Sequence, residues 1–300
     1  MHNKSAILIL LLICGLCSHI QLQAQQAEDS AKINAEAANP DFIHVSLIKV
    51  APGKEMISAY GHIAIRMQCP SKHLDYCFTF ESEDNWINKF KFFFGSIKAG
   101  YTAAATDLFI KNYQQEGRGI TEYKLNLTPK EKQKLWKNLD EQVESGLIWE
   151  YNYTTVQCTS MVAYILDKSL INENIKFGKL AYVLTHTFGD YHNIMTKNQP
   201  WLRLFTYIKY YSYKDRLVDP EGVLTPDLMI ETYQKAFFVD NTGHKRPVLL
   251  GKGKTLLANT LIIKPTFITP TLVGAILLGV LLAFFGWRIY RKKTFLFKYQ

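Results

Sequence analysis

Two residues of this chain could act together as a nucleophile and its base, Cys158 and His62. A cysteine thiolate attacks carbonyl carbons, and a neighbouring imidazole can take the thiol proton and return it to a leaving group. Cys158 begins an apolar run with helical spacing, so we expect it in the first turn of a helix, whose positive end favours a thiolate. His62 begins a run of alternating residues, typical of a strand. We therefore predict a cysteine on a helix facing a histidine on a strand.

The cysteine count also draws attention to Cys158. Of the five cysteines, Cys14 and Cys17 lie in the apolar part of an N-terminal export signal. Cys69 and Cys77 flank a turn-like segment and could form a hairpin disulfide, which would leave one thiol over. An odd thiol in an exported protein is a candidate nucleophile. The plainer alternatives are a buried apolar filler and a disulfide with Cys69 or Cys77.

Three further side chains are candidates for the same site. Alternation places Arg66 on the same strand face as His62, where it could contact a phosphate or form an ordinary ion pair. Asp75, in the expected neighbouring strand, is our candidate for orienting His62, with a turn or surface carboxylate as the alternative. Tyr60 could contact substrate or only pack. We expect no metal, because no second ligand lies at helical or hairpin spacing from His62.

The chain around these residues predicts an α+β fold. Strands rich in β-branched and aromatic residues are separated from helices that begin at Thr128, Cys158 and Thr225. A hairpin is expected at 241–243. The strands are expected at 42–50, 62–67, 75–80 and 121–127.

Both ends of the chain predict export and anchoring. An uncharged run after Lys4 and the small residue Ala24 indicate a cleaved signal. Residues 265–287 are uncharged and long enough to span a bilayer, and basic residues follow at once, which places the domain outside the cytoplasm. We predict a signal peptide (1–24), a loose leader (25–41), a periplasmic domain (42–252), a linker (253–264), a transmembrane helix (265–287) and a cytoplasmic tail (288–300).

The charge of the chain argues against nucleic acid as a partner. The formal net charge is +9, but six positive charges lie in the signal and the C-terminal segment, which leaves +3 for residues 25–264. That region shows no concentrated basic face and no nucleic-acid motif. A mildly basic surface near anionic lipid headgroups fits better.

The segment 201–211 combines apolar and aromatic residues with interleaved cations. Such a pattern is typical of an interfacial helix or a lid over an acyl chain. It also fits a segment that packs in the core or against the domain, and we favour this second alternative.

Residues 42 to about 250 resemble the N-terminal periplasmic domain of the Lnb family, bacterial lipoprotein N-acyltransferases similar to circularly permuted NlpC/papain folds, in which histidine precedes cysteine. Several motifs carry the resemblance in the right order. They are Ala51-Pro52-Gly53-Lys54-Glu55, Ser58 to Arg66, Leu74-Asp75-Tyr76, Leu108 to Tyr113, Glu116-Gly117-Arg118, Lys124 to Thr128 and Tyr151-Asn152-Tyr153 with Cys158-Thr159.

The resemblance implies an acyltransferase on the outer face of the bacterial inner membrane. Cys158 would accept a fatty acyl chain from a phospholipid as a thioester, and His62 would act as general base and acid. The acceptor would be the α-amino group of a diacylated lipoprotein cysteine, and no metal or organic cofactor is required. The chain departs from the family pattern at Gln157, where asparagine usually stands, and after Cys158, where an arginine is missing.

Two other classes of function compete with acyl transfer. Many NlpC-type domains are cysteine amidases or peptidases that act on cell-wall peptides, and these need an open, polar cleft. The other class is a non-catalytic, membrane-tethered binding module, in which Cys158 is disulfide-bonded or dispensable.

Overall fold

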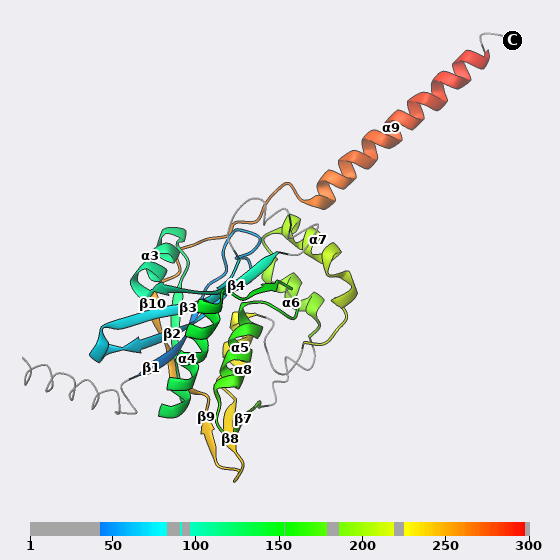
Figure 1. Ribbon diagram of the computed structural model, residues 1–300. Coiled ribbons are helices and arrows are strands. Elements are labelled where there is room, and N and C mark those ends of the chain that lie inside the picture. Colours follow the sequence, from blue (N-terminus) through cyan, green and yellow to red (C-terminus); the bar gives the residue numbers. More distant parts are fainter. Residues whose placement is uncertain are drawn as a thin grey trace, which may run out of the picture.

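The computed structural model describes residues 43–82, 91, 97–152, 154–178, 186–218 and 225–297. These residues form an α+β domain with a seven-stranded antiparallel sheet, ordered β10-β5-β1-β2-β3-β4-β6, and a three-stranded sheet, ordered β7-β8-β9 (Figure 1). The predicted α+β class with an antiparallel sheet is confirmed. The predicted signal peptide and leader lie outside the described residues.

The strands expected at 42–50, 62–67, 75–80 and 121–127 and the helices expected to begin at Thr128, Cys158 and Thr225 are present, and the structure adds further strands and helices. The strands are β1 (His44–Val50), β2 (His62–Cys69), β3 (Leu74–Glu81), β4 (Lys98–Ala105), β5 (Ile120–Leu125), β6 (Ile148–Glu150), β7 (Glu173–Lys176), β8 (Phe237–Asp240), β9 (Lys245–Pro247) and β10 (Leu249–Leu257). The helices are α3 (Thr106–Glu116), α4 (Pro129–Ser145), α5 (Cys158–Ser169), α6 (Phe188–Met195), α7 (Pro200–Lys209), α8 (Pro226–Tyr233) and α9 (Pro270–Phe297).

Strand β2 lies in the middle of the large sheet and is covered on both faces. Ile63, Ile65 and Met67 point into the main core, together with residues of α4 and α5. Ala64 points to the opposite face, where it packs in a smaller cluster with Phe109 of α3. This confirms the predicted alternation, and it places His62 at the first residue of a strand that neighbouring elements hold from both sides.

Side-chain caps fix where the two helices that flank the site begin. Thr128 and Glu131 form a complete capping box at the start of α4, as the sequence predicts. Gln157 caps α5: its side chain accepts from the backbone N–H of Thr159, while the Ser160 hydroxyl accepts from the backbone N–H of Gln157. A longer amide thus performs the capping role that asparagine commonly has, and Cys158 is the first residue of the helix.

The hairpin disulfide that Cys69 and Cys77 could have formed is not present in the structure. Both residues are buried free thiols, and so is Cys158. In the β2–β3 register Cys77 lies opposite Arg66, whereas Cys69 lies opposite Leu74. The two thiols are therefore several residues apart along the hairpin and point to opposite faces of it, because side chains alternate along a strand.

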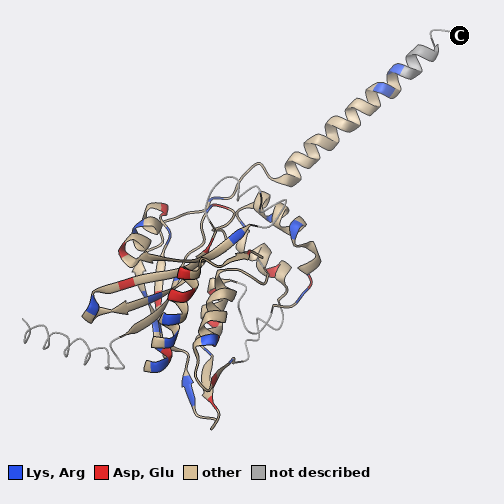
Figure 2. Cartoon of the chain, in the orientation of Figure 1, with Lys and Arg blue, Asp and Glu red and all other residues tan. Residues whose placement is uncertain are grey.

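The chain after the sheet leads directly to a long apolar helix. Strand β10 continues to Leu257, five residues into the segment expected to be a linker. Within α9, residues Pro270–Arg291 are long and apolar enough to cross a membrane, and this is the one such helix in the described part of the chain. Figure 2 shows the helix without charged residues until Arg288 and Arg291 near its far end. The predicted C-terminal apolar helix is confirmed.

Candidate active site

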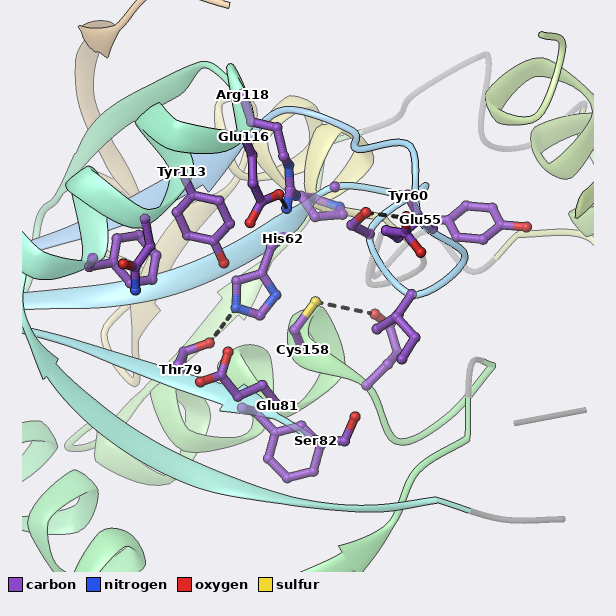
Figure 3. Close-up of a pocket in the computed structure, with 18 of the residues that line it drawn as sticks. Glu55, Tyr60, His62, Thr79, Glu81, Ser82, Tyr113, Glu116, Arg118 and Cys158 are labelled. Carbon is purple, nitrogen blue, oxygen red and sulfur yellow. Dashed lines mark hydrogen bonds and ion pairs between the residues drawn. The ribbon is translucent and has the colours of Figure 1, made fainter. Parts of the chain in front are cut away.

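A cavity of about 770 Å³ lies at the end of the large sheet where β2 begins. Three of the residues expected at the site line it, Cys158, His62 and Tyr60. Figure 3 shows the sulfur of Cys158 and the ring of His62 pointing toward one another inside this cavity. Its volume lies in the range typical of small-molecule sites. Helix α5 and strand β2 thus bring a thiol and an imidazole together across a separation of almost a hundred residues.

The Cys158 thiol is held in its protonated form. Burial raises the pKa of Cys158 to about 11, although hydrogen bonds from the backbone N–H groups of Ile63, Thr159 and Cys158 itself act to lower it. The thiol also donates to the side-chain oxygen of Gln157, 3.8 Å away. Backbone N–H groups of Ile63 and Cys158 thus lie beside the sulfur, where an oxyanion formed on an attacked carbonyl would need hydrogen-bond donors.

His62 is held in its neutral form. Burial lowers the pKa of His62 to about 3, and the positive charge of Arg118 lowers it further. Its Nε2 atom makes a hydrogen bond with the hydroxyl of Thr79 on β3. Nδ1 then lies on the side of the ring that faces Cys158 (Figure 3). A neutral imidazole whose Nε2–H donates to Thr79 presents a lone pair at Nδ1, which is the state that a general base requires.

Arg118 is the charged residue most deeply buried in the cavity wall. Only 3% of its surface is exposed, its Nε donates to the carbonyl of Ala51 at 2.7 Å, and Nη1 donates to Glu116 at 3.1 Å. Its guanidinium lies 4.8 Å from the ring centre of Tyr113. Nη2 is buried and has no hydrogen-bond partner among the described residues. A buried donor without an acceptor is costly, so Nη2 is suited to an oxygen of a bound ligand.

Two acids on opposite sides complete the charged lining. Glu81 lies beside His62 and Cys158 in Figure 3, and desolvation raises the pKa of its carboxyl even though the residue as a whole is exposed and accepts a hydrogen bond from Thr102. Glu116 pairs with Arg118. With Lys54 and Glu55 at the rim, the cavity is lined by both signs of charge around the neutral side chains of Cys158 and His62.

The expected role of Asp75 as the residue that orients His62 is wrong. The Asp75 carboxylate accepts from Arg66 at 2.6 and 2.8 Å, and from the Thr106 hydroxyl at 2.6 Å. The side chain that contacts His62 is Thr79. Because Asp75 is near the start of β3 and His62 is at the start of the antiparallel β2, the two residues lie at opposite ends of the hairpin.

Arg66 does not line the cavity either. Its guanidinium donates to both Asp75 and Glu122, so it forms the ordinary ion-pair alternative rather than a phosphate contact. Tyr60 does line the cavity, and its hydroxyl makes a hydrogen bond of 2.6 Å with Nδ1 of His192 on α6. Tyr60 therefore joins the cavity wall to the α6–α7 region.

Sequence reasoning missed several residues that the structure brings to the cavity. Thr79 could have been found from alternation, because it shares a strand face with Cys77, which lies opposite Arg66. Arg118 belongs to the motif Glu116-Gly117-Arg118, which carries the family resemblance but does not by itself indicate a role for the arginine. Glu81 follows the predicted strand and gave no signal of its own. In the described part of the chain, no group of three or more His, Cys, Asp and Glu residues could hold a metal ion.

One comparison with known proteins gives a match. The family described as the Lnb N-terminal periplasmic domain matches residues 29–196, which is more than half of the chain. Both His62 and Cys158 fall inside that match, as does Arg118. No curated protein matches, and no solved structure matches.

Proposed function

We propose, from the premise that this chain belongs to the Lnb N-terminal periplasmic domain family, that it is a thiol acyltransferase acting on lipoproteins at the bacterial inner membrane. Membership of the family indicates a lipoprotein-modifying enzyme in the periplasm. The proposed reaction moves a fatty acyl chain from a membrane phospholipid to the α-amino group of a diacylated lipoprotein cysteine. The observation that carries this proposal is that Cys158 and His62 line one cavity of a chain that also has a membrane-spanning candidate.

In the first half-reaction the Cys158 sulfur attacks the ester carbonyl of the phospholipid. The thiol proton passes to Nδ1 of His62 as the carbon–sulfur bond forms, because at neutral pH the thiol is protonated and the imidazole is neutral. The backbone N–H groups at the start of α5 stabilise the oxyanion. His62 then gives the proton to the departing alkoxide oxygen, the carbon–oxygen bond breaks, and lysophospholipid leaves a thioester on Cys158.

In the second half-reaction the neutral α-amino group of the lipoprotein cysteine attacks the thioester carbonyl. Nδ1 of His62 accepts a proton from the attacking nitrogen, the carbon–sulfur bond breaks, and the sulfur recovers the proton from His62. The amide product leaves and the enzyme returns to its starting state. We assign to Arg118 the binding of the phosphate of the acyl-donating phospholipid. Arg118 lines the cavity, and the N–H groups of its buried Nη2 have no hydrogen-bond acceptor among the described residues.

Intact-mass analysis of the full chain in phospholipid vesicles tests the proposal. Wild-type protein is expected to gain the mass of one fatty acyl group, and hydroxylamine is expected to remove it because it cleaves thioesters. The Cys158→Ala variant should gain nothing. Cys77→Ala is the matched control, since Cys77 is also a buried thiol with a raised pKa but does not line the cavity. An unmodified wild-type chain, or an adduct that persists in Cys158→Ala, contradicts the thioester mechanism.

One observation favours a second candidate, hydrolysis of cell-wall peptides. The cavity is lined by Lys54, Glu55, Glu81, Glu116 and Arg118, and such polar lining also suits a peptide with free amino and carboxyl groups. The same catalytic pair would form a thioester with the peptide and water would release it. Incubation with wall peptides, read as newly released amino groups, separates the two candidates, because an acyltransferase leaves those peptides intact.

A further inference from the structure

Helix α7 presents an apolar face that stays exposed among the described residues. Leu204, Phe205, Ile208 and Tyr211 are 37, 45, 64 and 58% exposed. Leu204 and Ile208 are four residues apart, so they lie on one side of α7. Tyr211 follows in the short 3-10 helix Tyr211–Tyr213, after α7 ends at Lys209. The alternative favoured from the sequence, a core or domain-packing segment, therefore holds for Leu202 but not for the exposed side chains of Leu204, Phe205 and Ile208.

The opposite side of α7 is firmly attached to the domain. Thr206 is buried, and its hydroxyl lies 2.7 Å from Nε2 of His192 on α6. Leu202 packs in the cluster that contains Tyr60 and Leu228. Because these contacts fix the rotation of the helix, they also fix which side chains point outward.

The exposed face lies beside the start of the apolar helix α9. The indole N–H of Trp201 donates to the carbonyl of Ile268 at 2.7 Å, and the Asn198 amide donates to the carbonyl of Ile263 at 3.0 Å. Helices α7 and α9 are in contact, and Figure 1 shows α7 next to the base of α9. Phe267, three residues before α9 begins, is 95% exposed. The apolar surface of α7 is thus continuous with the segment that leads into the membrane-spanning candidate.

The charge of this region suits an anionic surface. Residues 196–213 contain no aspartate or glutamate, and they include the cations Lys197, Arg203 and Lys209. Lys214, which follows, is paired with Asp215. Tyrosine and tryptophan residues accompany them, and Trp201 stacks on Phe205. Cations and amphipathic aromatic rings beside an apolar face are typical of segments that lie in the headgroup region of a bilayer.

We infer that α7 lies flat in the interface of the membrane that α9 crosses, with Leu204, Phe205, Ile208 and Tyr211 inserted among the lipid chains. The inference depends on α9 as the anchor and not on the acyl-transfer chemistry. It has a consequence for the cavity, because the side-chain N–H₂ of Gln199, the residue before α7, donates to the carbonyls of Gly53 and Lys54 at 3.3 Å. Lys54 lines the cavity, so an inserted α7 holds the cavity rim close to the lipid headgroups.

Depth-dependent fluorescence quenching tests the inference. An environment-sensitive fluorescent amino acid is introduced by amber suppression at position 208 of the full chain, which is reconstituted in vesicles of phosphatidylethanolamine with a minority of phosphatidylglycerol. The matched control carries the same residue in place of Lys137, whose side chain is 77% exposed on α4. Two quenchers are compared, phospholipid with mid-chain brominated acyl groups and aqueous iodide. Unchanged thermal unfolding of both labelled chains shows that the domain is intact.

The expected result is strong quenching at position 208 by the brominated lipid and several-fold less quenching by iodide than at position 137. Iodide quenching at 208 equal to that at 137 would overturn the inference, since it places α7 in water. Protection from iodide without quenching by brominated lipid would also overturn it, because a protein surface, such as a second copy of the chain, would then cover α7.

Discussion

His62 and Arg66 lie four residues apart on one face of the same strand, yet their side chains have different kinds of partner. Arg66 has its donors directed at the carboxylates of Asp75 and Glu122. His62 makes a hydrogen bond with the Thr79 hydroxyl on one side of its ring, and its other side faces the Cys158 thiol in the cavity. In the Arg66 cluster the opposite charges are paired with one another. At the His62 end of the strand the groups are neutral, and the side of the imidazole that faces Cys158 is still able to form a hydrogen bond.

Arg118, in the cavity wall, differs from Arg66 in the same way. Arg118 is more deeply buried than Arg66, but one of its nitrogens has no hydrogen-bond partner among the described residues. A saturated buried ion pair holds a structure together, and removing one partner is costly. A buried donor with nothing to bind indicates a site that a ligand completes. Saturation of hydrogen bonds, rather than charge or burial alone, therefore distinguishes the structural end of β2 from the candidate catalytic end.

Replacement of His62 is expected to have the largest effect on the chemistry. His62→Gln keeps a polar side chain but removes the base, so thioester formation on Cys158 should slow by roughly 10²–10⁴-fold, the usual contribution of a general base. Time-resolved intact-mass measurement of the acyl adduct checks this. His44→Gln, an exposed histidine on the adjacent strand β1, is the matched control and should react at the wild-type rate. A His62→Gln variant that acylates normally would remove His62 from the mechanism.

The ionisation state of Cys158 gives the next largest effect. A thiol with a pKa of about 11 is mostly protonated at pH 7 and loses its proton only as the pH rises toward that value. Alkylation of Cys158 by iodoacetamide without lipid should therefore accelerate about tenfold per pH unit between roughly pH 7 and 9, since the thiolate is the reacting species. Mass analysis of the peptide that contains Cys158 measures the rate. Rapid alkylation that is independent of pH from 5 to 8 would instead indicate a preformed thiolate–imidazolium pair.

Breaking the Arg66 cluster should damage the fold rather than the chemistry. Arg66→Met leaves Glu122, which is 7% exposed, without its cation, and we expect a loss of about 2–4 kcal/mol of unfolding free energy. For a domain of this size that lowers the unfolding midpoint by roughly 5–10 °C. Thermal unfolding of the detergent-solubilised full chain gives the measurement.

Lys49→Met serves as the control for Arg66→Met, because Lys49 pairs with a half-exposed Asp227 and should change the unfolding midpoint little. Arg66→Met protein that stays folded at low temperature is expected to acylate at nearly the wild-type rate. A stable but inactive Arg66→Met variant would contradict the view that the Arg66 end of β2 serves the fold and the His62 end serves the chemistry.

The sequence predicts most of the scaffold of this domain. Local signals place β1, β2, β3 and β5, the capping box at Thr128 and the helix that begins at Cys158, because alternation and caps depend on residues close in the chain. The cysteine count does not single out Cys158, because Cys69 and Cys77 are free thiols as well. The position of Cys158 at a helix start and of His62 at a strand start is what predicts that the two side chains lie together.

The partners of the site residues could not be predicted in the same way. Asp75 and Thr79 occupy alternate positions of one strand, and only the register of β2 against β3 decides which of them reaches His62. Arg118 reaches the cavity because α3 ends at Gly117 and the chain turns into β5, a geometry that depends on how α3 packs on the sheet. Such choices depend on long-range contacts, which local periodicity does not encode.

Replacement of Arg118 is expected to act mainly on donor binding. Arg118→Gln removes the buried Nη2 donor and should lower the acylation rate at low phospholipid concentration by about tenfold, with a smaller loss at saturation. Removing this charge should also raise the pKa of His62, because Arg118 is one of the two causes that lower it. Acylation rates over a series of lipid concentrations in mixed micelles measure the effect. Arg216→Gln, at an exposed arginine, is the control. An effect confined to the saturated rate would contradict the assignment to the donor phosphate.

Replacement of Thr79 should give the smallest change. The hydroxyl of Thr79 holds the His62 ring by one hydrogen bond, so Thr79→Val, which keeps the shape of the side chain, should cost about 1 kcal/mol, or roughly fivefold in acylation rate. Thr79→Ser keeps the hydroxyl and should restore most of the rate. Because Thr79 is a positioning residue, the loss is expected in the saturated rate and not in the dependence on lipid concentration, opposite to Arg118→Gln. Equal losses in the Val and Ser variants would mean that packing of the methyl group, not orientation of the imidazole, is what Thr79 contributes.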